Sequence, residues 1–264
     1  MANPRPVLRV LLPVAAALLT ALAVMLWQAP ASYLATAVSR ASGGRVELGE
    51  VEGTVWRGQG AILLDPGGRG AAQRTRLPGV TSWHLQALPL LFGALRLDLA
   101  NPALLEAPLA LRLDRARNGT LDANRLHLPA QVLVGLGAPW NTVEPGGELT
   151  LEWDTLHLSA GELRGGLRLQ WDGASSRLSP VVPFGRYRAE ADGVFPGAQM
   201  NLATLDGPME LDGSGTIDAA HRLQFRGTAR VRPGTDAAVA TQLSGLITLL
   251  GPRDGDTAVL NFGI

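Results

Sequence analysis

The sequence predicts an all-β domain, an antiparallel meander curled into a half-pipe or a partly open barrel with one or two short helices, preceded by one N-terminal transmembrane helix. Three observations lead to this prediction. Apolar and polar residues alternate through much of the chain, glycine-rich turns separate these runs, and one long uncharged apolar run lies near the N-terminus. Alternation is typical of strands with one buried and one solvated face. A sheet of many such strands must curl, close or be covered to hide its apolar face from water.

The apolar run covers residues 10–28 and follows a short tail, residues 1–9, that contains Arg5 and Arg9. A run of this length can cross a bilayer as a helix, whereas a signal-peptide core is usually shorter. We therefore expect an uncleaved membrane anchor, with residues 1–9 in the cytoplasm and the large domain on the other side. Cleavage after the APA at 29–31 remains the alternative. The expected anchor residues are Val10, Leu11, Leu12, Leu18, Leu19, Leu22, Val24, Leu26 and Trp27.

The chain after the anchor divides into a helical linker, residues 29–44, and a β domain, residues 45–264. The linker has apolar residues at helical spacing and ends in a Gly-Gly pair. In the β domain, alternation is clearest in four runs: LRLDL at 95–99, LALRL at 109–113, LTLEW at 149–153 and LRLQW at 167–171.

Turns and short helices separate the predicted strands. Asn118-Gly119 and Asp172-Gly173 suit tight hairpins, because glycine readily adopts a positive φ. Residues 131–136 indicate a weak helix. A stronger helix is expected at 240–250, because one face carries four apolar residues: Leu243, Leu246, Ile247 and Leu250.

The segment GTVWRG at 53–58 predicts a bent strand. Gly53 and Gly58 mark the bend, because a glycine inside a strand usually indicates a bulge or a close backbone approach. We expect Gly53, Trp56, Gly58 and Trp83 to be architectural residues, and we expect most tryptophans of the domain to pack in the core. The segment does not fit a phosphate-binding G-x-G-x-x-G motif, because Leu63 occupies the last position.

Composition argues against catalysis and against a metal site. The chain has no Cys and no Lys and a formal net charge of zero, which excludes thiol chemistry and lysine nucleophiles and gives nucleic acid no attractive field. The motif G-x-S-x-G is absent. Glu152 and Asp154 share a strand face, as an acid–base pair would, but a solvated outer face explains them better. The four histidines, His84, His127, His157 and His221, lack close metal-ligand spacing, and the acidic set Asp206, Glu210, Asp212 and Asp218 lacks the calcium-loop pattern. We expect no enzyme activity, cofactor or metal.

A proline-rich stretch at 179–188, SPVVPFGRYR, predicts a candidate partner surface. Pro180 and Pro183 favour an extended backbone, and apolar side chains beside Arg and Tyr are common at interfaces. A strand-to-strand corner that packs inward is the alternative. The candidate residues are Val181, Val182, Phe184, Arg186, Tyr187 and Arg188.

Five stretches, in their order and spacing, resemble the type II secretion system protein N family (general secretion pathway protein N). They are GTVWRGQG at 53–60, LPGVTSWHL at 77–85, LGAPWNTVEPGGELTLEW at 136–153, SSRLSPVVPFGRYR at 175–188 and LDGPMELDGSG at 205–215. The resemblance extends from the N-terminal span to LLGPRDG at 249–255 and covers nearly the whole chain. It implies a single-pass inner-membrane protein of Gram-negative bacteria, with its N-terminus in the cytoplasm and a periplasmic β domain.

The resemblance also implies an accessory, non-catalytic subunit for protein secretion, which acts in the export of folded proteins across the outer membrane. Its implied partners are other subunits of the inner-membrane platform and the secretin. A weaker resemblance of residues 207–231 to AsmA-like envelope proteins supports an alternative, lipid binding in an apolar groove. An open apolar trough would favour the lipid alternative, whereas a plugged sheet with a free edge would favour the secretion subunit.

Overall fold

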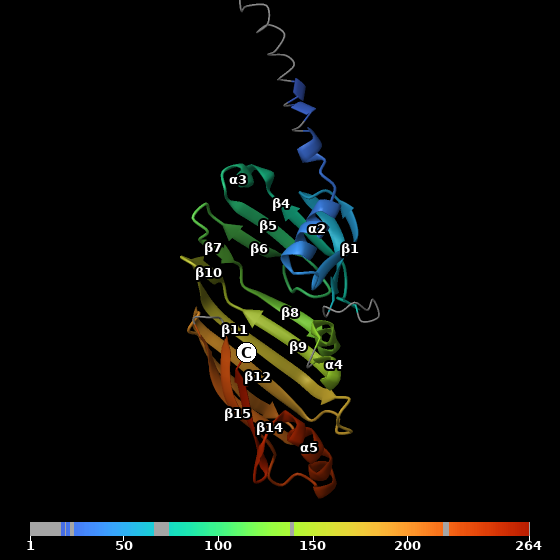
Figure 1. Cartoon of the computed structure of the whole chain (residues 1–264), viewed down its shortest axis with the longest axis vertical. Helices are drawn as coiled ribbons and strands as arrows, with labels where there is room; N and C mark the ends of the chain where they lie inside the picture. Colours follow the sequence, from blue (N-terminus) through green and yellow to red (C-terminus); the bar gives the residue numbers. More distant parts are fainter. Residues whose placement is uncertain are drawn as a thin grey trace, which may run out of the picture.

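The computed structural model describes residues 17–18, 20–21, 24–65, 74–137, 140–218 and 222–263. These residues form one large antiparallel sheet of 17 strands (Figure 1). The strands are β1 Val46–Gly53, β2 Arg57–Leu64, β3 Thr75–Arg76, β4 Thr81–Leu85, β5 Leu95–Ala100, β6 Leu109–Leu113, β7 Gly119–Leu121, β8 Asn124–Pro129, β9 Pro145–Trp153, β10 Leu156–Ser159, β11 Glu162–Ser176, β12 Gly185–Phe195, β13 Gln199–Asp206, β14 Met209–Ile217, β15 Leu223–Val231, β16 Arg253–Asp254 and β17 Thr257–Gly263.

Each strand pairs mainly with its neighbours in the chain. From one end, the order is β1, β2, β4, β5, β6, β7, β10 and β11. It continues through β12, β13, β14, β15, β17 and β16. The long strand β11 also pairs with β9, which carries β8 on its far side. Since β1 and the β17–β16 pair lie at the two ends of this order, the predicted antiparallel, unclosed sheet is confirmed.

The predicted alternation is confirmed at the centre of the sheet. Leu169 of β11 lies opposite Leu151 of β9 and Ala189 of β12. The adjacent residue, Arg168, lies opposite Glu152 and Glu190. Because successive side chains point to opposite faces, one face is apolar and the other is charged.

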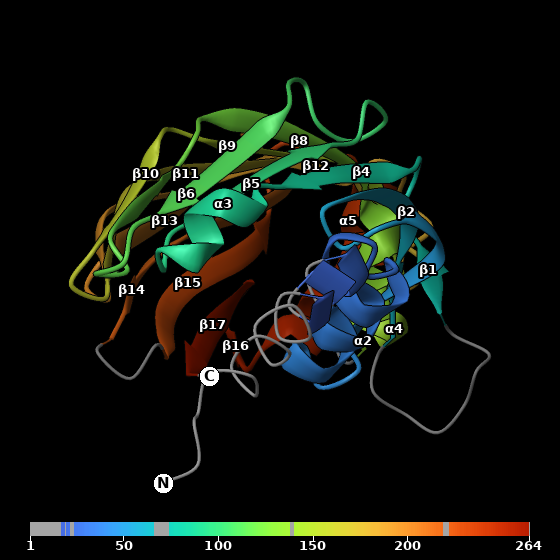
Figure 2. The ribbon, with the colours of Figure 1, turned by 90° about the horizontal axis from the view of Figure 1, so that it is seen from above.

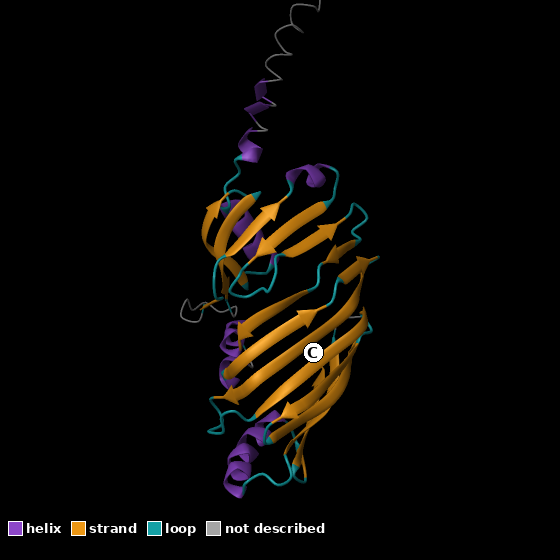
Figure 3. Cartoon of the chain, turned by 180° about the vertical axis from the view of Figure 1, so that it is seen from behind, coloured by secondary structure: helices purple, strands orange, loops and turns teal. Residues whose placement is uncertain are grey.

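The sheet curls into a half-pipe that leaves its apolar face on the inside. Figure 2 shows the arch formed by the strands, with α2, α4 and α5 beneath it. Figures 1 and 3 show these helices in a row along one side of the sheet. The helices are α2 Ser32–Ala41, α3 Ala87–Leu91, the 3-10 helix η2 Ala130–Leu136, α4 Trp140–Val143 and α5 Ala237–Leu250.

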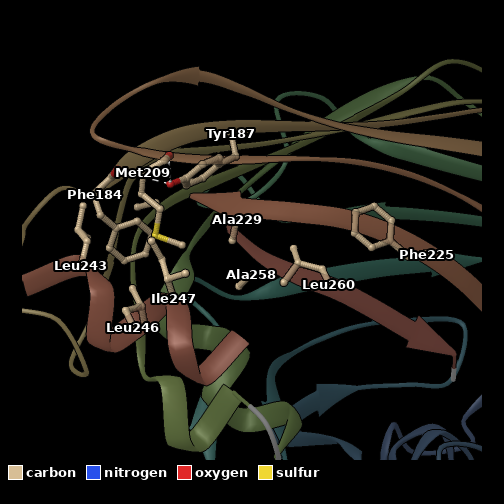
Figure 4. Packing of buried hydrophobic residues seen from close by; sticks show 11 residues of the cluster. Phe184, Tyr187, Met209, Phe225, Ala229, Leu243, Leu246, Ile247, Ala258 and Leu260 are labelled. Carbon is tan, nitrogen blue, oxygen red and sulfur yellow. Dashed lines mark hydrogen bonds between the residues drawn. The ribbon is translucent and has the colours of Figure 1, made fainter. Parts of the chain in front are cut away.

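The main core lies between α5 and the C-terminal half of the sheet (Figure 4). The helix begins at Asp236, whose carboxylate accepts a hydrogen bond from the backbone N–H of Ala238 at 2.8 Å, a typical N-cap. The predicted helix at 240–250 is confirmed. Leu243, Leu246 and Ile247 are buried against the strands, and Leu250 is partly buried at the border of the same cluster.

The turn chemistry differs from the prediction at two places. The hairpin between β6 and β7 forms, but its left-handed residue is Arg117, with φ 63°, and Gly119 already belongs to β7. Asp172-Gly173 forms no hairpin. It lies within β11, where the register shifts and Gly173, with φ 59°, forms a bulge. The bulge lets β11 continue to Ser176 with partners on both sides.

The N-terminal region is described in part. Of the expected anchor residues, Val10, Leu11, Leu12, Leu19 and Leu22 lie outside the described residues, whereas Leu18, Val24, Leu26 and Trp27 are described and exposed. In the described part of the chain, no helix is both long and apolar enough to cross a membrane. The expected linker helix is present as α2, which packs against β1.

Candidate functional site: the free edge and the concave face of the sheet

The edge at β1 carries the features that prevent strand addition. The register with β2 shifts between Gly49 and Glu52, and Glu50 has a positive φ of 51°. The strand also carries Glu47, Glu50 and Glu52 within eight residues. Arg76 binds Glu50 through two hydrogen bonds of 2.7 and 2.8 Å and lowers the pKa of that carboxyl. Bulges and charges of this kind keep an edge from pairing with another chain.

The edge at β17 has none of these features in its described residues. The pairing of β17 with β15 runs from Thr257 to Gly263 without a register shift. On its other side, β16 pairs only with Thr257 and Ala258. The strand sequence, TAVLNFG, contains neither a charged residue nor proline. This edge is therefore regular, neutral and largely unpaired among the described residues.

The direction of the β17 backbone groups follows from one hydrogen bond. The N–H of Val259 donates to the carbonyl oxygen of Pro252 at 2.8 Å, so it points away from β15. Backbone groups of successive residues in a strand point to alternate sides. The N–H and C=O of Asn261, two residues further on, therefore also point to the free side. Asn261 is exposed, so these groups are accessible to an added strand.

The free edge rests on the rigid core. Ala258 and Leu260 of β17 are buried at 0% and 4% exposure in the cluster under α5 (Figure 4). A partner strand at β17 would therefore extend a preformed sheet and would not have to order it. Preorganisation of this kind reduces the entropic cost of binding.

The concave face is partly plugged and partly open. Leu149 of β9 is buried at 6% exposure, and the adjoining helix η2 buries Ala130 and Val132. On the same face, Leu169 at the centre of β11 remains 38% exposed, although its cross-strand neighbours are apolar. An apolar stretch around Leu169 is thus open to solvent.

The predicted partner surface at 181–188 divides between the core and the exterior. Phe184 and Tyr187 are buried at 3% exposure each and pack on Trp171, with ring centroids 5.9 and 6.0 Å apart. The Tyr187 hydroxyl donates to the carbonyl oxygen of Met209 at 2.9 Å, and burial raises the Tyr187 pKa. These contacts match the inward-packing alternative.

The other four residues of this stretch do not form one exposed surface either. Val181 packs against the core cluster, whereas Val182 is 69% exposed. Arg186 is exposed on the outer face. Arg188 is half-buried there and donates to the Gln170 amide oxygen at 3.1 Å.

The turn between β1 and β2 connects the sheet to the segment before α2. The Ala31 N–H donates to the Gly53 carbonyl at 3.1 Å, and the Val55 N–H donates to the Ala29 carbonyl at 2.9 Å. Half-buried Trp56 donates its indole N–H to the Leu26 carbonyl at 2.8 Å. The GTVWRG stretch is therefore an attachment point, and Trp56 is not a core residue.

Trp83, unlike Trp56, packs in the core. It is 5% exposed and shares its indole N–H between the carbonyls of Thr54 and Val55, at 3.2 Å each. A Cβ on Gly58 would lie 2.5 Å from the Trp83 ring, so only glycine fits there. The bent strand predicted at 53–58 is instead a hairpin turn, in which Gly53, with φ 90°, ends β1 and pairs with Gly58 of β2.

Two acidic residues singled out in the sequence, Glu152 and Glu210, are engaged in ion pairs on the outer face. Glu152 accepts hydrogen bonds from Arg125 at 2.7 Å and Arg168 at 3.3 Å, and these arginines hold its pKa below the usual range. Glu210 is bound in the same way by Arg230 and Arg232. Such pairs explain the carboxylates without catalysis.

The histidines make only local contacts. Nδ1 of His84 lies 3.8 Å from the Asp98 carboxylate, and His127 contacts Thr150. His221 lies outside the described residues. Within the described ranges, no group of three or more His, Asp or Glu side chains is arranged to hold a metal ion.

Sequence reasoning missed the functional contrast between the two edges. The signal was present, since VELGEVEG at 46–53 contains three glutamates and TAVLNFG at 257–263 contains no charged residue. This difference in charge could be interpreted only from the strand order, which shows that these two strands lie at the ends of the sheet.

The family described as type II secretion system (T2SS), protein N matches residues 44–260, almost the whole sheet domain. No curated protein and no solved structure matches the chain. The family is a component of a membrane-associated secretion machine, which implies interaction with other components of that machine. This match covers well over half of the chain, so the chain belongs to the type II secretion system protein N family.

Proposed function

We propose that this chain is an accessory, non-catalytic inner-membrane subunit of the type II secretion system, which binds a partner subunit by strand addition at β17. Residues 1–9 would lie in the cytoplasm, 10–28 would span the membrane, 29–44 would link, and 45–264 would form the periplasmic domain. Family membership supports the assignment to the type II secretion system. The uncharged run at 10–28 supports the transmembrane anchor.

The contrast between the two sheet edges carries the proposed binding mode. The β1 edge is bulged and acidic, whereas the β17 edge is regular, neutral and supported by the core. An added strand gains affinity from main-chain hydrogen bonds. Asn261 directs its backbone N–H and C=O to the free side and would supply these bonds, whereas the Val259 N–H is already donated to the Pro252 carbonyl. The partner is expected to contribute an extended, weakly charged segment from another subunit of the inner-membrane platform or from the secretin.

A substitution at Asn261 tests the edge without breaking the fold. Asn261→Pro removes an N–H that points to the free side, so the pairing with β15 is retained, as for proline on natural edge strands. We expect the full-length variant to lose secretion-system subunits in pull-downs from native membranes. Asn261→Ser keeps the N–H and should retain them. Equal partner recovery with Asn261→Pro would refute the edge as the binding site.

Cysteine cross-linking gives a second, position-specific test, because the natural chain has no Cys. Asn261→Cys on β17 should cross-link to a secretion subunit in intact cells. Glu52→Cys on the acidic edge is the matched control and should not. Cross-linking at position 52 alone would move the partner to the β1 edge.

A second function, binding of a lipid acyl chain in the half-pipe, is supported by Leu169. This side chain is 38% exposed at the middle of an apolar concave face. The same native-membrane preparations can be read for lipids by mass spectrometry. Bound lipid that is lost in Leu169→Arg but kept in Val259→Arg would support this function. Recovery of secretion subunits without lipid would refute lipid binding and would support only the strand-addition function.

A further inference from the structure

The loop between β4 and β5 presents a dense group of exposed apolar side chains. It contains α3, Ala87–Leu91, followed by Phe92. Leu88 is 70% exposed, Leu91 80% and Phe92 72%, and Leu90 is 37% exposed. Contiguous exposed apolar residues of this kind usually mark a contact with a partner or a membrane.

The exposure of this loop is fixed by its backbone. The Gln86 N–H donates to the Arg96 carbonyl at 3.0 Å and closes the base of the loop. The Phe92 N–H donates to the Pro89 carbonyl at 3.0 Å, and Gly93, with φ 76°, ends the helix. The loop is thus hydrogen-bonded in a conformation that turns its large side chains outward.

The position of α3 relates it to the expected membrane anchor. Figures 1 and 3 show α3 at the same end of the molecule as the described residues that precede α2, and Figure 2 looks onto that end. Those residues also expose apolar side chains, with Leu18 at 67% and Met25 at 72%. Trp27 and Tyr33, at 69% and 66% exposure, are of the types favoured at the bilayer interface. A membrane that holds the N-terminal segment would lie toward α3.

The charges around α3 suit an anionic surface. Residues 86–95 contain no charged side chain. Arg96, Arg115 and Arg117 make no ion pair with any described residue, and a Cβ on Gly93 would lie 3.3 Å from Cγ of Arg115. Arg96 also lies directly opposite Arg112 across the β5–β6 pair. Arg112 is paired with Asp122 at 2.8 Å, so Arg96 is the member of this pair whose charge an anion beside the strands would neutralise.

We propose that α3 and Phe92 insert into the headgroup region of an anionic phospholipid bilayer, as a second membrane contact beside the N-terminal anchor. Apolar residues at the acyl boundary with arginines at the phosphates are the usual composition of an interfacial element. The inference rests on the anchor of the proposed function and is independent of the partner at β17. Two contacts would fix how the sheet stands on the membrane and keep α5, at the opposite end (Figure 1), away from it.

Single-cysteine labelling of the full-length chain tests this contact, because no natural Cys interferes. Leu18→Cys, Leu91→Cys and Leu249→Cys each carry a polarity-sensitive fluorophore, and each protein is reconstituted into phosphatidylethanolamine–phosphatidylglycerol vesicles. Leu249 is 68% exposed on α5 and is the matched control. We expect a quencher near the lipid headgroups to quench position 91 and a quencher near the chain ends to quench position 18. Position 249 should respond to neither quencher.

The outcomes separate this contact from the anchor. Quenching at 18 but not at 91 would overturn the α3 contact, leave the anchor intact and make a protein the occupant of the exposed patch. Absence of quenching at both positions would overturn both. Quenching at 91 alone would support the α3 contact and refute the anchor. Replacing phosphatidylglycerol by phosphatidylcholine should weaken the quenching at 91, and no change would overturn the role given to the arginines.

Discussion

The indole N–H of Trp56 lies 2.8 Å from the carbonyl oxygen of Leu26, so a side chain of the β1–β2 turn holds the end of the N-terminal segment. Two backbone hydrogen bonds from the same turn, to Ala29 and from Ala31, flank this contact. The direction of the segment relative to the sheet therefore depends on this turn. This explains the tryptophan between two glycines better than core packing does.

Replacing Trp56 by Phe should loosen this attachment without unfolding the sheet. The ring is kept, but the hydrogen bond to Leu26, worth about 1 kcal/mol, is lost. We expect faster amide hydrogen exchange at Ala31 and Val55, whose bonds lie next to it. Exchange in β11 is the internal control and should not change. Unaltered exchange at Ala31 would show that the backbone bonds suffice.

Trp83→Ala should destabilise the domain far more than Trp56→Ala. Trp83 is 5% exposed, and removing a buried tryptophan costs about 3–5 kcal/mol. Trp56 is half-buried, so its loss should cost about 1 kcal/mol, the size of one hydrogen bond. Urea unfolding of both variants measures the difference. Equal losses would place both rings in the core.

Gly58→Ala should destabilise the protein, because the added methyl group meets the Trp83 ring and the Glu52 carbonyl, each 2.5 Å from the ideal Cβ. Overpacking of this kind costs about 1–3 kcal/mol. Gly245 of α5 is the matched control, since no atom lies within 4 Å of its ideal Cβ. Gly245→Ala should stabilise the helix by about 1 kcal/mol. Thermal unfolding of the two variants should therefore shift in opposite directions.

The regular parts of the fold could be predicted because they depend on local patterns. The alternating runs at 95–99 and 167–171 became β5 and part of β11, and the apolar face at 240–250 became the buried face of α5. The bulge at Gly173 could not be predicted in this way, because it depends on the register of β11 with strands on both sides. Turn propensity alone favours a hairpin there.

The candidate surfaces were harder to predict, because they depend on contacts distant in sequence. Phe184 and Tyr187 look like interface residues until Met209 and α5 cover them. The free edge at β17 is defined by a missing neighbour, which only the strand order reveals. The apolar loop at 87–92 is legible in the sequence, but its proximity to the N-terminal segment is a property of the fold.

Glu152→Gln should reduce the loss of stability in acid. Arg125 and Arg168 lower the pKa of Glu152 in the folded state. The contribution of Glu152 to the free energy of unfolding is therefore present above its unfolded pKa of about 4.3, and it is lost as the pH falls through the lowered folded-state pKa. The pair is partly exposed, so the effect should stay below about 1 kcal/mol. Urea unfolding at neutral pH and at about pH 3 measures it. Glu148, which makes no ion pair with a described residue, is the control, and an equal effect of Glu148→Gln would contradict the assignment.

Tyr187→Phe should remove most of the alkaline sensitivity of the fold. The chain has two tyrosines, no Lys and no Cys, so a buried phenol is the side chain through which alkaline pH can act on the fold. Burial raises the pKa of Tyr187 in the folded state. The contribution of Tyr187 to the free energy of unfolding is therefore fully present below about pH 10, and it is lost as the pH rises toward the raised folded-state pKa.

The two tyrosines can be separated by matched variants. At neutral pH, Tyr187→Phe should cost about 1 kcal/mol, because the bond from its hydroxyl to the Met209 carbonyl is lost. At higher pH the gap to the natural protein should narrow, because the variant has no buried phenol to deprotonate on unfolding. Tyr33 is 66% exposed, so Tyr33→Phe is the matched control that removes a phenol outside the core. Urea unfolding of the natural protein and both variants from neutral to alkaline pH measures these differences, and tyrosinate absorbance reports when the phenols deprotonate. A slope that persists in Tyr187→Phe would mean that a group other than this phenol limits alkaline stability.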